Sequence, residues 1–181
     1  LEGERLHLSH GPIDVVLKAW GEPEAMRAAY AAAGARFPTI LPELCDELAR
    51  QLWADAEGAH HQIAIDVVRA ATEPEALAVG RSVARSNLFK CAIFGGDPNW
   101  GRVLAAIGTT DATFDPGAVD VVMNGVTVCR DGSIGEPREA VDLSGREIAV
   151  TVDLKAGEAA ATILTTDLTH DYVHENSAYS T

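Results

Sequence analysis

Two polar stretches of this sequence contain side chains that could bind a substrate, and the first is Asp55-Ala56-Glu57-Gly58. Its carboxylates follow an apolar helical pattern and precede an alternating, strand-like one. The helix dipole disfavours acidic residues at a helix C-terminus, so their position needs another explanation. A Glu57 side chain that points into a cleft would bind a cationic group of a substrate. The pattern alone is more typical of solvent-exposed acids at a helix end.

The second stretch is the polar end of the chain, residues 167–181. His170 and His174 are four residues apart, as on one face of a metal-binding helix, but the HExxH arrangement is absent, and we predict no metal site. Such an end is usually solvated, although its many polar side chains, including Asn176, would also suit a tail folded over a site. No Ser/His/Asp or Cys/His arrangement has a specific catalytic spacing.

A third stretch, Gly95 to Arg102, places glycines between an apolar run and a short helical pattern. Glycines in this position could cradle an anion, with Arg102 nearby. The spacing matches neither GxGxxG nor the P-loop, so it gives weak support for nucleotide binding. Gly, Pro and Asn also build tight turns, which Trp100 would anchor in the core. We favour this structural interpretation.

Helical and strand patterns alternate along the chain. A capping box at Thr72 and Glu75 opens one helix, and Asn124-Gly125 predicts a tight β-hairpin. A second hairpin is expected around residues 155–158. The predicted helices are 23–36, 41–56, 73–85 and 100–107, and the predicted strands are 5–8, 13–17, 61–69, 88–94, 119–123, 126–130, 148–154 and 159–166. This order indicates an α/β fold, a layered α+β sandwich in which helices pack on mixed sheets.

Charge and composition limit the classes of partner. The 181 residues contain 14 Lys and Arg against 27 Asp and Glu, a net charge of −13. Nucleic acids and anionic membranes bind clustered cations, so we expect neither as a partner. No apolar run approaches the ~20 residues of a membrane span and no signal peptide is apparent, so we expect a cytoplasmic protein. Cys45, Cys91 and Cys129 are far apart, which predicts buried, reduced thiols rather than a disulfide or zinc site.

Several strings of residues occur in the order of one enzyme family. They are ADAEG at 54–58, ARSNLFK at 84–90, GDPNWGR at 96–102, VDL at 141–143 and TDLTHDYVHENSAY at 166–179. On these strings, residues 45–181 resemble the C-terminal (β-chain) part of ornithine acetyltransferase, the bifunctional glutamate N-acetyltransferase of arginine biosynthesis. The resemblance implies a partial ornithine acetyltransferase-like fold.

The resemblance also implies an acetyl transfer from N2-acetylornithine to glutamate, without a cofactor or metal. In this family a precursor is cut before a threonine, whose new α-amine can serve as base for its hydroxyl. An oxyanion hole from the other chain stabilises the intermediate. Residue by residue, Glu57 matches the acid that binds the amino end of the substrate, while Asn176 and Thr181 match tail residues that close over it.

The chain departs from this family in its nucleophile. The cleavage motif is not found, Leu1 is not the nucleophilic threonine, and Thr39, Thr72 and Thr109 lack its context. We therefore expect no catalytic residue in this chain and no activity from the chain alone. Its partners would be the small-molecule substrates N-acetylornithine and glutamate, together with an α-chain-like partner or a second copy, because much apolar surface would otherwise be exposed.

Residues 1–44 resemble a different family. The strings RLHLSHGPID at 5–14 and AWG at 19–21 are similar to the start of an uncharacterised bacterial family that is distantly related to flavin transferases. This segment is too short to build a flavin site. We predict two domains, a β-β-α cap over residues 1–44 and the ornithine acetyltransferase-like part over 45–181. The alternative function is a non-catalytic substrate-binding or assembly module from a fused or rearranged gene.

Overall fold

The computed structural model describes residues 37–178, and for residues 37–44 and 46 it describes the backbone alone. The elements expected within residues 1–36 and the site residue Thr181 lie outside the described residues.

The chain divides into two compact units, residues 1–54 and 55–181. Helix α3, Phe37–Ala54, belongs to the first unit and contains most of the helix expected at 41–56. Leu48 and Leu52, two apolar residues of α3, remain open to solvent and are 43% and 66% exposed. The domain boundary expected after residue 44 stays a prediction.

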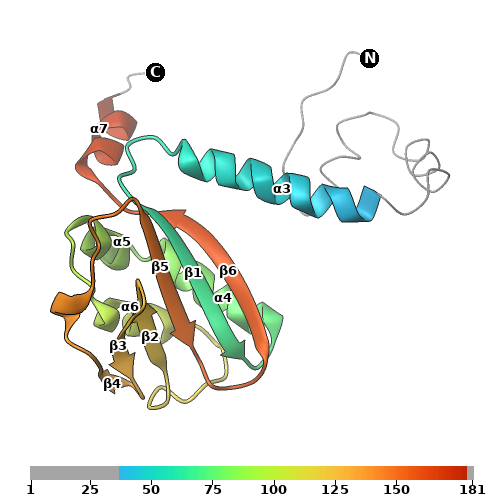
Figure 1. Ribbon diagram of the computed structural model, residues 1–181, viewed down its shortest axis with the longest axis vertical. Coiled ribbons are helices and arrows are strands. Elements are labelled where there is room, and N and C mark those ends of the chain that lie inside the picture. Colours follow the sequence, from blue (N-terminus) through green and yellow to red (C-terminus); the bar gives the residue numbers. More distant parts are fainter. Residues whose placement is uncertain (1–36, 179–181) are drawn as a thin grey trace. The chain divides into compact units, whose positions relative to one another are not determined.

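The second unit is built around a six-stranded mixed sheet, which confirms the expected α/β class (Figure 1). Its strands are β1 (Gln62–Ala70), β2 (Asp120–Met123), β3 (Val126–Arg130), β4 (Ser133–Ile134), β5 (Glu147–Asp153) and β6 (Ala159–Thr166). They lie in the order β4-β3-β2-β5-β1-β6. The predicted hairpin joins β2 to β3, and Asn124 and Gly125 have φ angles of 44° and 85°, as a tight hairpin turn requires.

The second predicted hairpin is wrong, because β5 and β6 are not neighbours. Strand β1 lies between them, parallel to β5 and antiparallel to β6. The connection between β5 and β6 crosses the end of β1, where the N–H groups of Ala156 and Gly157 donate to Arg69 O at 2.8 and 2.9 Å. A Cβ on Gly157 would lie 2.5 Å from Ala70 O, so this crossing requires glycine. Burial of the apolar strand β1 between two neighbours outweighs the local hairpin.

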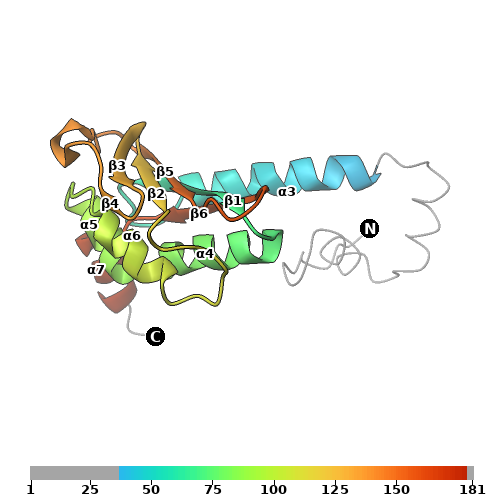
Figure 2. The ribbon, with the colours of Figure 1, turned by 90° about the horizontal axis from the view of Figure 1, so that it is seen from below.

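Helices α4 (Glu73–Arg85), α5 (Asn87–Phe94) and α6 (Trp100–Ile107) cover one face of the sheet (Figure 2). Two of them have their predicted bounds. The capping box is confirmed, since Thr72 Oγ1 accepts from Glu75 N at 3.4 Å and donates to the Glu75 carboxylate at 2.8 Å. A 3₁₀ turn (Arg138–Ala140) and helix α7 (His170–Ala178) complete the unit.

The strand predicted at 88–94 is wrong, since these residues form α5. Ser86 starts this helix by accepting a hydrogen bond from Phe89 N at 3.3 Å. Phe89, Ala92 and Ile93 are buried, which is a helical spacing. A short apolar run has no period that separates a buried strand from a buried helix, and the tertiary contacts decided here.

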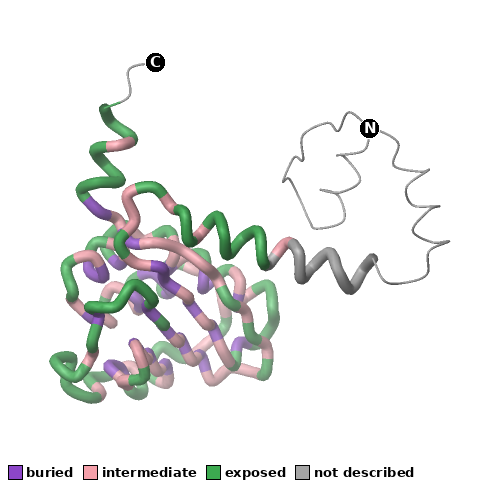
Figure 3. Tube along the Cα trace, turned by 45° about the horizontal axis from the view of Figure 1, so that its top comes forward, coloured by how far each residue is buried: buried purple, intermediate pink, exposed green. Residues whose placement is uncertain are grey.

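The core lies between the sheet and these helices (Figure 3). Along β1, Ile63, Ile65 and Val67 face the helices, as the alternation predicted, and all three are fully buried. Gly80 of α4 allows close approach, because a Cβ there would lie 2.6 Å from Ile163 Cγ1 on β6. None of the helices within residues 37–178 has the length and apolar content that crossing a bilayer requires.

The three cysteines differ in how far they are buried. Cys129 is buried as expected, Cys45 is half-buried and all three are unpaired. Cys91 is exposed, so the prediction of a buried thiol was wrong there. It lies on the outer side of α5, opposite the buried residues of that helix.

Candidate functional site

Asp167 holds the loop before β1 against the segment that leads into α7. Its side chain is fully buried. One carboxylate oxygen, Oδ1, accepts from the backbone N–H groups of His60 and His61, both at 3.0 Å. The other, Oδ2, accepts from His61 Nδ1 at 2.7 Å. The two stretches that sequence analysis singled out, residues 55–58 and 167–178, are thus neighbours.

His61 connects this anchor to a third segment. Its Nε2 donates to Leu143 O at 3.2 Å, while its Nδ1 faces the carboxylate of Asp167. Both ring nitrogens therefore face oxygen acceptors, one on Asp167 and one on the backbone of Leu143. The contact between the His61 ring and the Asp167 carboxylate is nearly shielded from solvent. Hydrogen bonds to a carboxylate fix the loop more strongly than bonds between neutral groups would.

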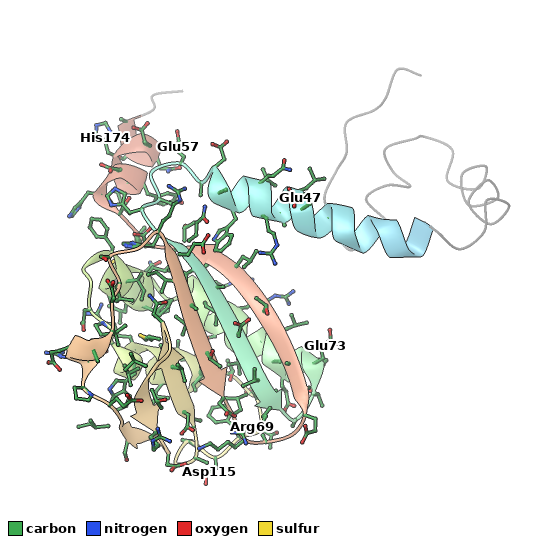
Figure 4. The ribbon with its side chains drawn as sticks, in the orientation of Figure 1. Glu47, Glu57, Arg69, Glu73, Asp115 and His174 are labelled. Atoms are coloured by element: carbon green, nitrogen blue, oxygen red, sulfur yellow. The ribbon has the colours of Figure 1, made fainter. Side chains whose placement is uncertain are left out.

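The loop also touches the backbone of α7. Gly58 has a φ of +68°, and a Cβ there would lie 2.5 Å from Tyr172 N. The buried Thr169 caps α7, since its Oγ1 accepts from Tyr172 N at 2.9 Å and donates to Gly58 O. A glycine is required here for both its backbone angle and its size. Glu57, the residue before it, is exposed beside α7 (Figure 4).

A second set of contacts surrounds Phe94 at the end of α5. Its ring lies between those of His60 and His170, with centroid distances of 5.3 and 5.4 Å. His60 Nε2 also pairs with Asp171 Oδ2 at 2.9 Å, on the exposed side. Three elements, the loop, α5 and α7, therefore meet at this end of the sheet.

Lys90 of α5 lies near the carboxylate of Asp167. Burial lowers the pKa of the half-buried Lys90 ammonium, and the Asp167 carboxylate opposes that effect. Its backbone oxygen accepts from Leu168 N at 3.4 Å. Neither Lys90 nor His61 was predicted to be a site residue from the sequence. The assignment of residues 88–94 to a strand hid the position of Lys90, and the signal for His61 was a histidine directly before an alternating strand.

The predicted site residues lie as follows. Glu57 and Asn176 are both exposed, on the loop and on α7. Asn176 Nδ2 donates to Tyr172 O at 2.8 Å, and Tyr172 is the residue whose backbone contacts Gly58. Asn176 lies about one helical turn after Tyr172, so Glu57 and Asn176 are carried by adjoining segments of the structure.

His170 and His174 have the sequence spacing of metal ligands on one helix face, so their contacts matter for a possible metal site. His170 packs on Phe94, and His174 Nδ1 lies 3.8 Å from Glu175 Oε1. Across residues 37–178, no three His, Cys, Asp or Glu side chains come together in a way that could hold a metal ion. The two predicted site residues that the structure describes, Glu57 and Asn176, carry a carboxylate and an amide, which are groups that can bind an amine.

Gly95 to Arg102 forms the structural turn that sequence analysis favoured. Asn99 caps α6 by accepting from Arg102 N at 3.2 Å, and its Nδ2 donates to Asp97 Oδ2 at 2.9 Å. Trp100 packs against the core. The polar side chains of the turn thus hold its own backbone in place.

Comparison with known proteins identifies the relatives of this chain. The model of the ArgJ family matches residues 14–181. The match includes part of the segment 1–44, in which sequence analysis saw a second resemblance.

Two curated relatives are both named arginine biosynthesis bifunctional protein ArgJ. The one from Thermobifida fusca is 63% identical over 147 residues, which is 81% of this chain and 38% of the relative. The one from Streptomyces coelicolor is 60% identical over 144 residues, 80% of this chain and 38% of the relative. The chain thus spans about two fifths of the length of these relatives.

A solved structure gives the same assignment. The crystal structure of arginine biosynthesis bifunctional protein argJ from Bacillus halodurans matches with a TM-score of 0.75 and 32% sequence identity. The match covers 80% of this chain and 70% of that one.

Proposed function

Because this chain belongs to the ArgJ family, we propose that it takes part in acetyl transfer from N2-acetylornithine to glutamate in arginine biosynthesis. Its role is to bind the substrate. The observation that carries the proposal is the attachment of the Glu57 loop to the segment that leads into α7, through Asp167 and Thr169. The exposed Glu57 carboxylate thus lies beside the helix that carries Asn176.

In this proposal Glu57 binds the amino end of the substrate. Its carboxylate is exposed and has no partner that the described residues reveal, so it is available to an ammonium group. The neighbouring Gly58 fixes the direction of the loop. Asn176 and Thr181 close over the substrate from the C-terminal tail, with Asn176 placed by α7.

The 181 residues by themselves are proposed to bind without turnover, since a threonine in the family's cleavage context is not found among them. Removing the nucleophile from a catalytic unit typically costs several orders of magnitude in rate. Membership of a biosynthetic family supports the cytoplasmic location expected from the sequence.

Calorimetric titration of the full chain with L-ornithine tests the binding role. Glu57→Gln keeps the shape of the side chain and removes its charge, so we expect about tenfold weaker binding. Glu73→Gln is the matched control, because Glu73 is an exposed glutamate at the opposite end of the sheet (Figure 4). Equal affinity of the Glu57→Gln variant and the unmodified chain would remove Glu57 from the site.

An acetyl-transfer assay from N-acetylornithine to glutamate, with mass detection of acetylated protein, tests the absence of turnover. We expect neither product nor an acetyl-enzyme from the chain alone. An acetylated residue would reveal a nucleophile and contradict this part of the proposal.

A second proposed role is assembly with another polypeptide, an α-chain-like partner or a second copy. The sheet face opposite α4–α6 carries Ala64, Ala149 and Leu164, which are adjacent across the register of β5, β1 and β6. Leu48 and Leu52 on α3 are exposed as well. Ala149 is exposed, and Ala64 and Leu164 are half-buried. Apolar surface that stays open to solvent favours association. Analytical ultracentrifugation at micromolar concentration should show a dimer or larger species, and a monodisperse monomer would contradict self-association.

A further inference from the structure

A groove with a volume of about 580 Å³ lies on the helical layer of the second unit, and none of its lining residues belongs to the Glu57 loop or to α7. Arg81 and Arg85 of α4 line it from one side, and Arg102 of α6 lines it from the other. Figure 2 shows these helices adjacent to one another on the face of the sheet that they cover. None of the described residues that line the groove is acidic.

The guanidinium groups are available to a ligand. Arg81 and Arg85 are one helical turn apart, so both side chains lie on the same side of α4. Both are exposed, and neither forms an ion pair with any residue that the structure describes. Arg102 is half-buried, and its Nη1 donates to Leu88 O, which holds the side chain at the groove.

This concentration of cations contrasts with the rest of the chain. The whole sequence has a net charge of −13, yet three arginines meet here without a neutralising carboxylate in the groove. Arg69, Arg138 and Lys155 elsewhere in the unit are paired with acids. Like charges that are placed close together repel each other, and a bound anion relieves that repulsion.

The volume and lining of the groove fit a ligand that is larger than a simple ion. Volumes of about 300–1,000 Å³ are typical of small-molecule sites. Leu88 is 64% exposed at the groove, and Ala78 and Ala105 add further apolar surface. Guanidinium groups bind phosphate oxygens through two parallel hydrogen bonds. They therefore prefer phosphate to a single-atom anion, which cannot accept such a pair of bonds.

We propose that this groove binds a small phosphate-bearing organic molecule, with its phosphates on Arg81, Arg85 and Arg102 and its uncharged part on Leu88. The site is independent of the proposed ornithine site, because it shares no residue with the Glu57 loop or α7. An acidic peptide is the rival occupant, but the groove has the size of a small molecule.

Calorimetric titration of the full chain with inorganic pyrophosphate and with adenosine 5′-diphosphate, at low ionic strength, tests the proposal. We expect saturable binding of one ligand per chain, with the nucleotide binding more tightly than pyrophosphate because Leu88 contacts its uncharged part. Arg85→Ala should weaken binding about tenfold, and the double variant Arg81→Ala/Arg85→Ala should weaken it further. Arg85→Lys keeps the charge and loses the paired hydrogen bonds, so it should also bind more weakly.

Arg130→Ala is the matched control, since it removes the same charge from an exposed position on β3 outside the groove. It should change affinity less than twofold, and circular dichroism should show that all variants are folded. Three results would each overturn the proposal. They are binding that does not saturate, an equal loss in the Arg130→Ala variant, and tighter binding of a hexaglutamate peptide than of the nucleotide.

Discussion

Replacing Asp167 by alanine removes the side chain that joins the loop before β1 to the segment that leads into α7. The buried carboxylate accepts three hydrogen bonds, two from backbone N–H groups and one from the His61 ring. A hydrogen bond to a charged group contributes about 1.5–3 kcal/mol, but bonds that share one side chain are not additive. We therefore expect the free energy of unfolding to fall by about 3–5 kcal/mol, near the low end of the sum of three such bonds.

The Asp167→Asn variant keeps the shape of the side chain and removes its negative charge, so it measures the contribution of the charge to stability. Its Oδ1 can still accept the two backbone N–H groups, and its Nδ2 can donate to Nδ1 of a neutral His61 ring. That ring keeps its Nε2–H on Leu143 O, so every polar group retains a partner. We expect a smaller loss, about 1–2 kcal/mol.

Urea denaturation followed by circular dichroism measures these losses. Asp171→Ala is the control, because its pair with His60 is largely exposed and should contribute less than about 1 kcal/mol. Amide hydrogen exchange in α7 gives an independent readout, since the first turn of α7 should open more often in the Asp167→Ala variant. If Asp167→Ala cost no more than Asp171→Ala, the role of Asp167 as the anchor would be refuted.

Three further predictions concern single residues. Gly58→Ala and Gly96→Ala both place alanine at positive φ, but only Gly58 has α7 backbone within 3 Å, so its variant should lose at least about 1 kcal/mol more in urea denaturation. Burial lowers the pKa of Lys90, so the unfolded chain binds more protons between that pKa and the ordinary lysine value. Stability should therefore rise with pH in this alkaline window, and Lys90→Met should abolish the rise. The Thr113 N–H lowers the pKa of Glu75, so stability should fall as pH drops from about 5 to 3, and less so in Glu75→Gln. A parallel acid profile for both proteins would contradict that role.

Local signals in the sequence determined several elements of the second unit. Thr72 and Glu75 cap α4, and Asn124-Gly125 forms the turn between β2 and β3. The cap and the turn both depend on residues that are close in the chain. The alternation of Ile63, Ile65 and Val67 determined which face of β1 is buried. These features were predictable because side-chain hydrogen bonds and periodic burial act over a few residues.

The tertiary structure decided what local patterns leave open. Residues 88–94 are apolar enough for a strand or a helix, and their helical state depends on the core that Phe89 and Ile93 enter. Strand β1 separates β5 from β6, because a central apolar strand needs a neighbour on each edge. The sequence singled out the Glu57 loop and the tail separately. Only the fold joins them, through an Asp167–His61 pair that spans 106 positions and so has no local signature.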